Sequence, residues 1–443
     1  MKGKVPPAVL VIGGGIAGIQ AALNVADAGI QVYLVEREPS IGGRMAQLDK
    51  TFPTLDCSSC ILTPRMVEVA RHPNIELMTY SEVMAVAGEV GHFRVTVKKK
   101  PRYVDVDKCI GCGLCAQACR LGMRIPGEFD AGMGKRSAIY VPFPQAVPLK
   151  YTVDSERCIL LTRGVCGDTL LCKDACPADA LDFDQQEQFV ELQVGAIIVA
   201  TGFEPFDAVR KPEFGYGRYP NVITGLEFER LASASGPTAG TITLNGKVPR
   251  DVVFIQCVGS RDRQVGNSYC SRVCCMATAK QAHLVREKLP NAKVTVFYMD
   301  VRAFGKGFEE FYDRVREEGV VYRRGNPSEI VRSTQDKERL VVRAEDTLEG
   351  RPVEVEANLV VLAVGMMPRS DAGSLGKMLG LERSDDGFFA EAHPKTRPVS
   401  TATPGVFLAG CCQGPKDIPD TVAQAKAAAS SAIILVSSQM TVG

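Results

Sequence analysis

Half of the sixteen cysteines in this 443-residue chain lie in one stretch, from Cys109 to Pro177. The first four are Cys109, Cys112, Cys115 and Cys119, separated by two, two and three residues. Gaps this short bring thiols together, which suits metal ligation better than the disulfide framework of a small secreted domain. The chain therefore has to build a compact unit around these sulfur atoms.

The spacing of these four cysteines is that of bacterial-type ferredoxins, in which three thiolates bind one [4Fe–4S] cluster and the fourth binds its neighbour. We assign Cys109, Cys112, Cys115 and Cys176 to one cluster, and Cys119, Cys158, Cys166 and Cys172 to the other. The second run has longer gaps, so Ile159–Val165 and Gly167–Leu171 are expected to loop out. A zinc site or a set of buried thiols is the alternative.

The start of the chain carries a dinucleotide-binding pattern in its required context. An apolar strand, Ala8–Ile12, leads into a glycine-rich turn, and a helix is expected over Ile19–Ala28. A second strand, Gln31–Val35, then ends at an acidic residue. A purely structural turn is the alternative.

Each residue of this pattern has an expected role. Gly13 makes the turn, Gly15 lets the backbone approach a pyrophosphate, and Gly18 allows close packing of helix and strand. Glu36 can accept hydrogen bonds from a ribose. The pattern thus predicts a bound dinucleotide.

Further segments favour FAD over NAD. The Ile41–Arg44 segment resembles the double-glycine segment of glutathione-reductase-like flavoproteins, and the strand from Ala196 ends in Ala-Thr-Gly. Leu359–Gly365 repeats that strand pattern, and Gly405–Gly410 resembles the last flavin-binding segment of the same class. The helix expected over Thr421–Val436 would direct its positive end at the flavin. The additional cofactor-binding residues are Arg37, Gly43, Arg44, Thr201, Gly202 and Gly410.

A second Rossmann-like domain is expected from about Gly246 to Glu354. Its strand Asp251–Gln256, helix Ser271–Lys288 and strand Lys293–Tyr298 alternate as in a nucleotide-binding unit. No glycine-rich phosphate loop joins the first strand to the helix, so we expect no nicotinamide there.

Four cysteines replace that loop: Cys257, Cys270, Cys274 and Cys275. On the expected helix, Cys270 and Cys274 would be one turn apart and share a face. Four thiolates at one strand–helix junction can bind a [4Fe–4S] cluster or zinc. Buried free thiols are the alternative.

Together these motifs resemble the FAD-carrying iron–sulfur subunit of heterodisulfide reductase, HdrA. The resemblance is carried by Gly13–Gly18, Leu55–Pro64, Cys109–Pro177, the four cysteines from Cys257 to Cys275, and Gly410–Ile418. It implies a thioredoxin-reductase-like core with FAD, Lys416 and Ile418 beside the flavin, three clusters and flavin-based electron bifurcation. It also implies heterodisulfide-reductase-like B- and C-type subunits, a hydrogenase- or formate-dehydrogenase-linked donor, and ferredoxin as partners.

Longer members of that family carry an extra N-terminal domain and a C-terminal ferredoxin domain. We expect both to be absent here, and the electron exit to be either lost or delegated to another subunit, which counts against bifurcation by this subunit alone. Electron relay is expected to remain.

Three further hypotheses concern single residues. Lys280 or Lys416 would stabilise an anionic reduced flavin by charge attraction, with an exposed lysine as the alternative. Cys57 and Cys60 form a C-x2-C pair, for which we favour a cluster-related role over a redox dithiol or buried thiols. We expect Cys411 and Cys412 to be packing residues.

The predicted fold is α/β, with two Rossmann-like domains and an inserted dicluster ferredoxin domain. The expected parts are 1–100, 188–245 and 355–443 for the FAD domain, 101–187 for the insert and 246–354 for the second domain. The predicted function is that of a cytoplasmic electron-transfer oxidoreductase subunit in a hetero-oligomer. An NAD(P)H-dependent reductase like the glutamate synthase small subunit, and a cluster-holding scaffold, are the alternatives. A net charge of +1 argues against nucleic acid or an anionic membrane as partner, and no apolar run is long enough to span a bilayer.

Overall fold

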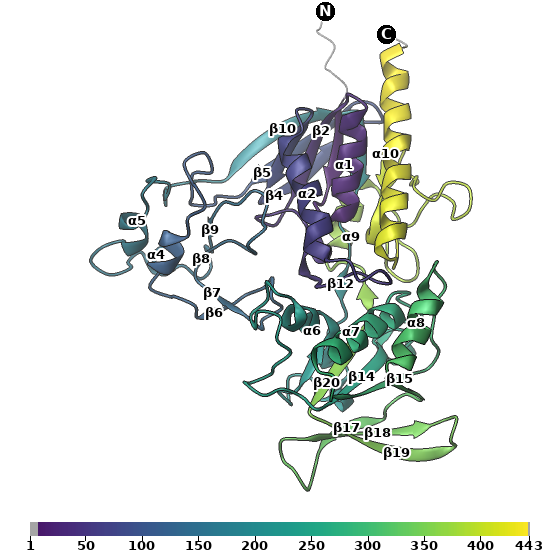
Figure 1. The fold of residues 1–443 in the computed structure, drawn as a ribbon. Coiled ribbons are helices and arrows are strands. Elements are labelled where there is room, and N and C mark those ends of the chain that lie inside the picture. Colours follow the sequence, from purple (N-terminus) through teal and green to yellow (C-terminus); the bar gives the residue numbers. More distant parts are fainter. Residues whose placement is uncertain (1–7, 442–443) are drawn as a thin grey trace, which may run out of the picture.

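The computed structural model describes residues 8–441, which form an upper domain, a lower domain and an insert beside them (Figure 1). The upper domain is built on a parallel sheet that collects strands from distant parts of the chain. In spatial order these are β22 (Val406–Leu408), β11 (Ala196–Val199), β1 (Ala8–Ile12), β2 (Gln31–Glu36) and β3 (Ile75–Thr79). The upper domain is thus assembled from three separate chain segments.

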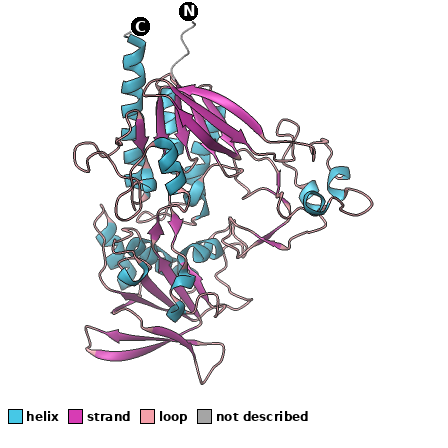
Figure 2. Cartoon of the chain, turned by 180° about the vertical axis from the view of Figure 1, so that it is seen from behind, coloured by secondary structure: helices cyan, strands magenta, loops and turns pink. Residues whose placement is uncertain are grey.

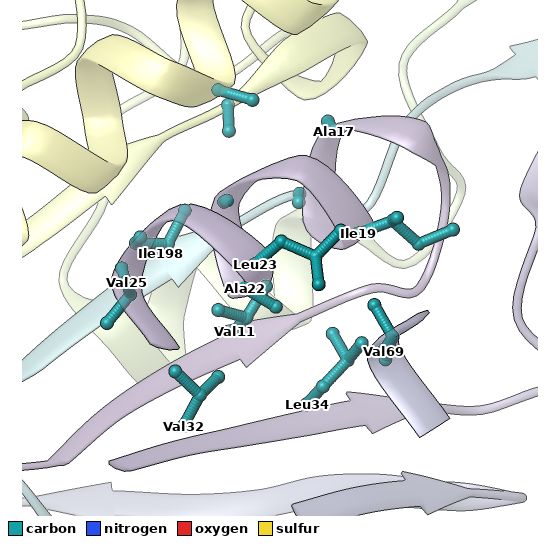
Figure 3. Close-up of a cluster of buried hydrophobic side chains, with 14 of the residues drawn as sticks. Val11, Ala17, Ile19, Ala22, Leu23, Val25, Val32, Leu34, Val69 and Ile198 are labelled. Carbon is teal, nitrogen blue, oxygen red and sulfur yellow. The ribbon is translucent and has the colours of Figure 1, made fainter. Parts of the chain in front are cut away.

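Helices α1 (Ile16–Asp27), α2 (Ser58–Arg71) and α10 (Ile418–Thr441) cover one face of this sheet. Figure 3 shows the core between α1 and the strands, where Ile19 and Leu23 lie against the sheet. β1 is buried along its whole length, as a continuous apolar run predicts for a central parallel strand. α1 begins one turn before the expected Ile19, because the carbonyl of Gly15 already accepts the Ile19 N–H at 2.9 Å.

An antiparallel sheet covers the opposite face of the upper domain. Its order is β10 (Gln188–Val194), β5 (Phe93–Lys99) and β4 (Ser81–Ala87). Apolar residues of β5 and β10 pack against Leu10 and Ile12 of β1. α9 (Ala372–Leu379) contributes Leu375 and Leu379 to the same core.

The lower domain has a parallel sheet of its own. Its order is β13 (Val222–Thr224), β20 (Leu359–Val364), β14 (Asp251–Val258), β15 (Lys293–Tyr298) and β16 (Val321–Arg324). Helices α6 (Gly225–Ala232), α7 (Cys274–Lys288) and α8 (Phe308–Glu317) pack on one face. The other face is covered by an antiparallel sheet of β17 (Glu329–Arg332), β18 (Leu340–Asp346) and β19 (Arg351–Ala357).

The lower domain is wider than the expected range 246–354. β13 and β20 lie outside that range, yet β20 pairs with both β13 and β14 in the second sheet. Sequence order did not reveal this, because a parallel strand can join a sheet from far along the chain. The two domains are joined by a short antiparallel pair, β12 (Glu204–Pro205) and β21 (Met366–Met367).

The insert leaves the upper domain between β5 and β10, which pair with each other up to Lys99 and Gln188. It extends to the left in Figure 1 and to the right in the reversed view of Figure 2. Its elements are short: β6 (Ile125–Pro126), β7 (Lys135–Arg136), β8 (Ile139–Tyr140), β9 (Thr152–Val153), α3 (Leu114–Gln117), α4 (Ile159–Arg163) and α5 (Leu171–Asp174). Cysteines form much of its core. None of the helices described within residues 8–441 is long and apolar enough to cross a membrane.

One buried arginine connects all three parts of the molecule. The side chain of Arg230, on α6 of the lower domain, is only 1% exposed. It donates to Asp130 of the insert at 3.0 Å and to the carbonyl of Gln47 in the upper domain at 3.1 Å. Its guanidinium also lies 4.8 Å from the ring centre of Phe129. Arg230 therefore fixes the insert against both domains.

We predict that Arg230→Met loosens the insert. The substitution keeps the apolar volume but leaves Asp130 without its cation, and breaking a buried ion pair costs about 3 kcal/mol. Thermal unfolding should shift to lower temperature, and limited proteolysis should cut residues 101–187 faster. Arg314→Met on α8 is the control, because the Arg314 side chain is 49% exposed. Equal protease resistance of Arg230→Met and the wild type would contradict the assignment.

Candidate functional site

A cavity of about 1720 Å³ lies where the upper domain, the lower domain and the insert meet. It opens at the carboxyl ends of β1, β2 and β11, which is where parallel α/β sheets bind ligands. Many of the predicted cofactor residues line it: Gly13, Gly15, Glu36, Arg37, Gly43, Arg44, Thr201, Gly202, Lys416 and Ile418. Gly18 and Gly410 lie in the packing behind the cavity wall.

The glycines of the first turn are required by close backbone contacts. A Cβ on Gly18 would lie 1.8 Å from the Gly13 carbonyl oxygen, and one on Gly13, whose φ is +107°, would lie 2.5 Å from the Ala200 oxygen. At Gly15 the nearest atom to a Cβ is Gly43 Cα at 3.9 Å, on the cavity side. Two glycines thus hold the turn tight, and the third leaves backbone open to a ligand.

Glu36 holds the glycine turn in place through hydrogen bonds to the backbone. Its carboxylate accepts the Gly14 N–H at 2.6 Å and the Glu38 N–H at 2.9 Å. Burial raises the pKa of Glu36, while these two N–H donors act in the opposite direction. The carboxylate is therefore fixed at the cavity wall, where it can accept hydroxyl hydrogen bonds.

Two arginines border the same end of the cavity. Arg44 donates to Gln47 at 3.0 Å, and burial lowers the pKa of Arg44. Arg37 pairs with Asp371 at 2.7 Å and is 42% exposed, so it lies at the rim. Their positive charges suit a ligand that carries phosphates.

The C-terminal segment places a buried lysine at the cavity. Lys416 Nζ donates to the carbonyls of Gly410 and Gly414 at 3.0 and 2.7 Å and to Gln413 at 2.9 Å. Burial lowers the pKa of Lys416. α10 starts at Ile418 rather than at the expected Thr421, since the Thr421 N–H already donates to the Asp417 carbonyl. Its positive N-terminal end therefore lies at the cavity wall.

Lys280 also lines the cavity, but it is already paired. Its Nζ lies 2.5 Å from Glu229 Oε1 and 2.9 Å from the Lys50 carbonyl oxygen. The two side chains are 2% and 1% exposed, and Gln281 donates to the same Glu229 oxygen at 2.6 Å. Glu229 was not singled out in the sequence. In the sequence, Glu229 can be recognised only as an acidic residue on a short helix that is otherwise amphipathic.

The ferredoxin-like cysteines form two groups, each around a small cavity. Cys109, Cys112, Cys115 and Cys176 line one, and Cys119, Cys158, Cys166 and Cys172 line the other. Burial, with repulsion from Cys176 and Cys109, raises the pKa of Cys115 to about 12. Burial, with repulsion from Cys119, raises the pKa of Cys172 to about 11. Thiolates at these positions therefore need a nearby positive centre, which the irons of a cluster supply.

The first of these cavities shares a wall with the large one. Gly111 and Tyr151 line both cavities. The sulfur group of Cys109 to Cys176 is thus separated from the large cavity by little more than these two residues.

The third cysteine group stands at the end of β14. Burial and, after it, charge repulsion between the cysteines raise the pKa of Cys257 to about 11 and hold the pKa of Cys274 well above its usual value, so these thiols lie close together. Cys274 also lines the large cavity. Within residues 8–441, His, Cys, Asp and Glu side chains form no group of three or more that would hold a single metal ion.

The expected helical pairing of Cys270 with Cys274 is wrong. α7 begins at Cys274, and Cys270 lies in the preceding loop because Arg272 has a φ of +62° that interrupts the helix. Cys257 and Arg261 also have positive φ, at +61° and +56°. Three non-glycine residues with positive φ at one junction show that the backbone of this segment is strained.

The remaining cysteines behave differently. Cys57 and Cys60 form a disulfide at the start of α2, with Cα atoms 5.2 Å apart, which departs from the cluster-related role we favoured. Neighbouring thiols in a C-x2-C pair reach this geometry without any metal. Cys411 and Cys412 are both buried, and Cys412 Sγ donates to the Val199 carbonyl at 3.1 Å.

Family comparisons match three parts of the chain. Residues 8–55 match FAD dependent oxidoreductase, residues 176–432 match pyridine nucleotide-disulphide oxidoreductase, and residues 102–123 match the 4Fe-4S binding domain. The site residues fit these descriptions, because the glycine cradle suits a dinucleotide and the sulfur groups suit iron–sulfur clusters.

Individual proteins extend the likeness to nearly the whole chain. The A-type subunit of H(2):CoB-CoM heterodisulfide,ferredoxin reductase from Methanothermobacter marburgensis is 53% identical over 98% of this chain and 64% of its own length. The A-type iron-sulfur subunit of CoB--CoM heterodisulfide reductase from Methanocaldococcus jannaschii is 56% identical, over 97% and 64% respectively. The thioredoxin reductase structure of Lactococcus lactis aligns with a TM-score of 0.52 at 15% identity, over 98% of this chain and 99% of its own. Together with the 4Fe-4S match, this likeness confirms the predicted fold class.

We predict that Gly18→Ala abolishes FAD retention. The new Cβ would collide with the Gly13 carbonyl oxygen, so the turn that faces the dinucleotide has to move. FAD affinity should fall at least about tenfold, or ~1.4 kcal/mol. Flavin released from equal amounts of purified protein measures this. Gly373→Ala is the control, because nothing lies within 4 Å of its Cβ position. Full flavin content in Gly18→Ala would contradict the predicted role.

Proposed function

Because the chain belongs to the pyridine nucleotide-disulphide oxidoreductase family and is a homologue of the HdrA subunit of heterodisulfide reductase, we propose that it is an FAD- and [4Fe–4S]-containing electron-transfer subunit of a heterodisulfide-reductase-like complex. The chain spans slightly less than two thirds of the length of these relatives. The activity of the complete complex is therefore part of the proposal.

One observation carries this proposal: the large cavity is bordered by two cysteine groups on different sides. Cys274 of the β14–α7 junction lines it directly, and Gly111 and Tyr151 separate it from the first ferredoxin-like group. A cofactor in the cavity would thus have a sulfur group in the lower domain and another in the insert within a short distance. This arrangement suits electron relay in two directions.

The cofactors supply the redox chemistry, FAD as a carrier of one or two electrons and each [4Fe–4S] cluster as a carrier of one. The chain supplies position and charge. The glycine turn and Glu36 would hold the dinucleotide, while Lys280, Lys416 and the start of α10 place positive charge at the cavity. We assign Lys280 a role in stabilising negative charge on the reduced flavin.

We propose three clusters, held by the ligand sets predicted from the sequence. The insert would hold two, and Cys257, Cys270, Cys274 and Cys275 would hold the third. Burial and, after it, repulsion between neighbouring thiols raise the thiol pKa values in each group, which supports this proposal because the positive charge of cluster iron would offset both effects.

The proposed partners follow from the relatives. The M. marburgensis relative is named for H(2), a heterodisulfide and ferredoxin, and one from Methanococcus maripaludis also for formate. We propose B- and C-type subunits of the heterodisulfide reductase kind, a hydrogenase- or formate-dehydrogenase-linked donor, and ferredoxin as partners of this chain. Division of electron pairs between a high- and a low-potential acceptor is the proposed activity of the assembled complex.

The competing function is NAD(P)H-dependent reduction of the flavin. The match to the pyridine nucleotide-disulphide oxidoreductase family is the observation that favours it. At the corresponding junction this chain has a long loop from Gly259 to Val273 and a cysteine group instead of a glycine-rich turn. Addition of NADPH to the purified chain without oxygen discriminates the two. We expect no loss of flavin colour, and rapid bleaching would refute the proposal.

We predict about twelve irons and one FAD per chain in protein purified without oxygen, as three clusters require. Cys109→Ser and Cys257→Ser should each lower the iron content by about four, because each removes one ligand of a different cluster. Cys412→Ser is the matched control, since its hydrogen bond to Val199 can persist. Iron and sulfide analysis measures this. An unchanged iron content in Cys257→Ser would remove the third cluster from the proposal.

We predict that Lys280→Met lowers the two-electron potential of the flavin. Loss of the cation leaves Glu229 as an uncompensated negative charge at the cavity, which disfavours the reduced anion. We expect a decrease of at least ~30 mV, equivalent to ~1.4 kcal/mol. The double variant Lys280→Met/Glu229→Gln should recover part of it. Spectroscopic redox titration measures both, with Lys288→Met, exposed on the same helix, as control. Identical potentials in wild type and Lys280→Met would exclude the role.

A further inference from the structure

The nitrogen of a buried side-chain amide beside the third cysteine group has no hydrogen-bond partner among the described residues. Gln256 precedes Cys257 on β14 and is 3% exposed. Its Oε1 accepts a long hydrogen bond from the Cys275 thiol at 3.6 Å, while its Nε2 has no partner among the described residues. A buried donor without an acceptor loses its bonds to water and gains nothing in return. Such an orphan therefore points to an acceptor that belongs to the functional state.

The chemistry of a metal-bound cysteine supplies that acceptor. A thiol can donate to the Gln256 carbonyl, but a thiolate that binds iron has lost its proton and can only accept. The amide nitrogen then becomes the complementary group, and rotation of the amide end brings it to Cys275. Cys275 as a thiolate would thus accept from the amide nitrogen that has no other partner among the described residues.

A second donor reaches the same cysteine group from the following loop. The Arg261 side chain is 25% exposed, and its positive charge lies near enough to Cys257 to act on the pKa of that thiol against the effect of burial. Its position is fixed by Asp300, whose carboxylate lies 2.8 Å from the guanidinium. Arg261 also has a positive φ of +56°, an unfavourable backbone conformation for a residue other than glycine. The Cys275 thiol also lies 3.6 Å from the Asp300 carbonyl oxygen, on the same side as Arg261.

We propose that Gln256 and Arg261 are positioning residues that donate N–H hydrogen bonds to Cys275 and Cys257 and thereby raise the reduction potential of the cluster these cysteines hold. This rests on the proposed third cluster. Reduction adds negative charge to a cluster, and N–H donors and a nearby cation stabilise that charge. These donors at the β14–α7 junction thus favour electron transfer to this cluster from a cofactor in the large cavity. Cys274 lines that cavity.

The test is an EPR-monitored redox titration of the full chain, purified without oxygen. Gln256→Met removes the amide at similar length, and Arg261→Gln removes the charge while retaining a polar side chain. Arg263→Gln is the matched control, because Arg263 is an exposed arginine of the same loop. Cys257→Ser identifies which EPR signal belongs to this cluster.

We expect the midpoint of that signal alone to fall in Gln256→Met and in Arg261→Gln. A tenfold lower ratio of reduced to oxidised cluster at fixed potential corresponds to a shift of about 59 mV for one electron. The midpoints of the two insert clusters and of Arg263→Gln should stay unchanged. If Gln256→Met loses iron, the midpoints of Arg261→Gln and Arg261→Lys test the tuning role instead. Arg261→Lys keeps the positive charge, so its midpoint should fall less than that of Arg261→Gln.

Two outcomes overturn the inference, and they are distinct. If Cys257→Ser loses iron but neither Gln256→Met nor Arg261→Gln moves the midpoint, the tuning role fails and the third cluster stands. If Cys257→Ser keeps all iron and every signal, the third cluster itself is refuted, and the tuning role falls with it.

Discussion

Burial of clustered cysteines is the constraint on which this molecule depends. Three groups of four cysteines are each drawn into a small volume, where burial, and after it repulsion between neighbouring sulfur atoms, makes the thiols difficult to ionise. Bound cluster iron would remove that penalty, so we expect metal binding and folding to be coupled in the insert, whose core includes six cysteines. The large sheets of the two domains have apolar cores of their own and do not share this dependence.

The position of the insert follows from interactions with both domains. Arg230 reaches Asp130 and the Gln47 carbonyl, and Gln47 in turn donates to the Phe129 carbonyl at 2.8 Å. These contacts keep Gly111 and Tyr151 at the wall of the large cavity. On the opposite side, Cys274 is held by α7, the helix that also carries Lys280. The proposed charge control by Lys280 and the proposed electron relay through Cys274 therefore share one helix.

Local patterns in the sequence were sufficient for most of the fold. The buried run of β1, the glycine turn and the short cysteine gaps each specify their structure within a few residues, so their prediction needed no knowledge of distant contacts. Features that depend on long-range packing were missed. Glu229 lies 51 residues from its partner Lys280, and β20 joins its sheet from beyond the expected domain boundary. Arg272 interrupts the expected helix through a backbone conformation that no residue preference indicates.

The paired ends of β5 and β10 have a consequence for how such a protein arises. Lys99 and Gln188 are neighbours in one antiparallel ladder, so the host sheet is complete on both sides of the excursion. A short turn between these two strands would restore an ordinary hairpin, so the metal-bearing part is inserted at a loop of the host sheet. Phe143, Ala146 and Val147 of the insert also pack in the core of the upper domain, so a chain that gained this part had to accommodate new side chains there.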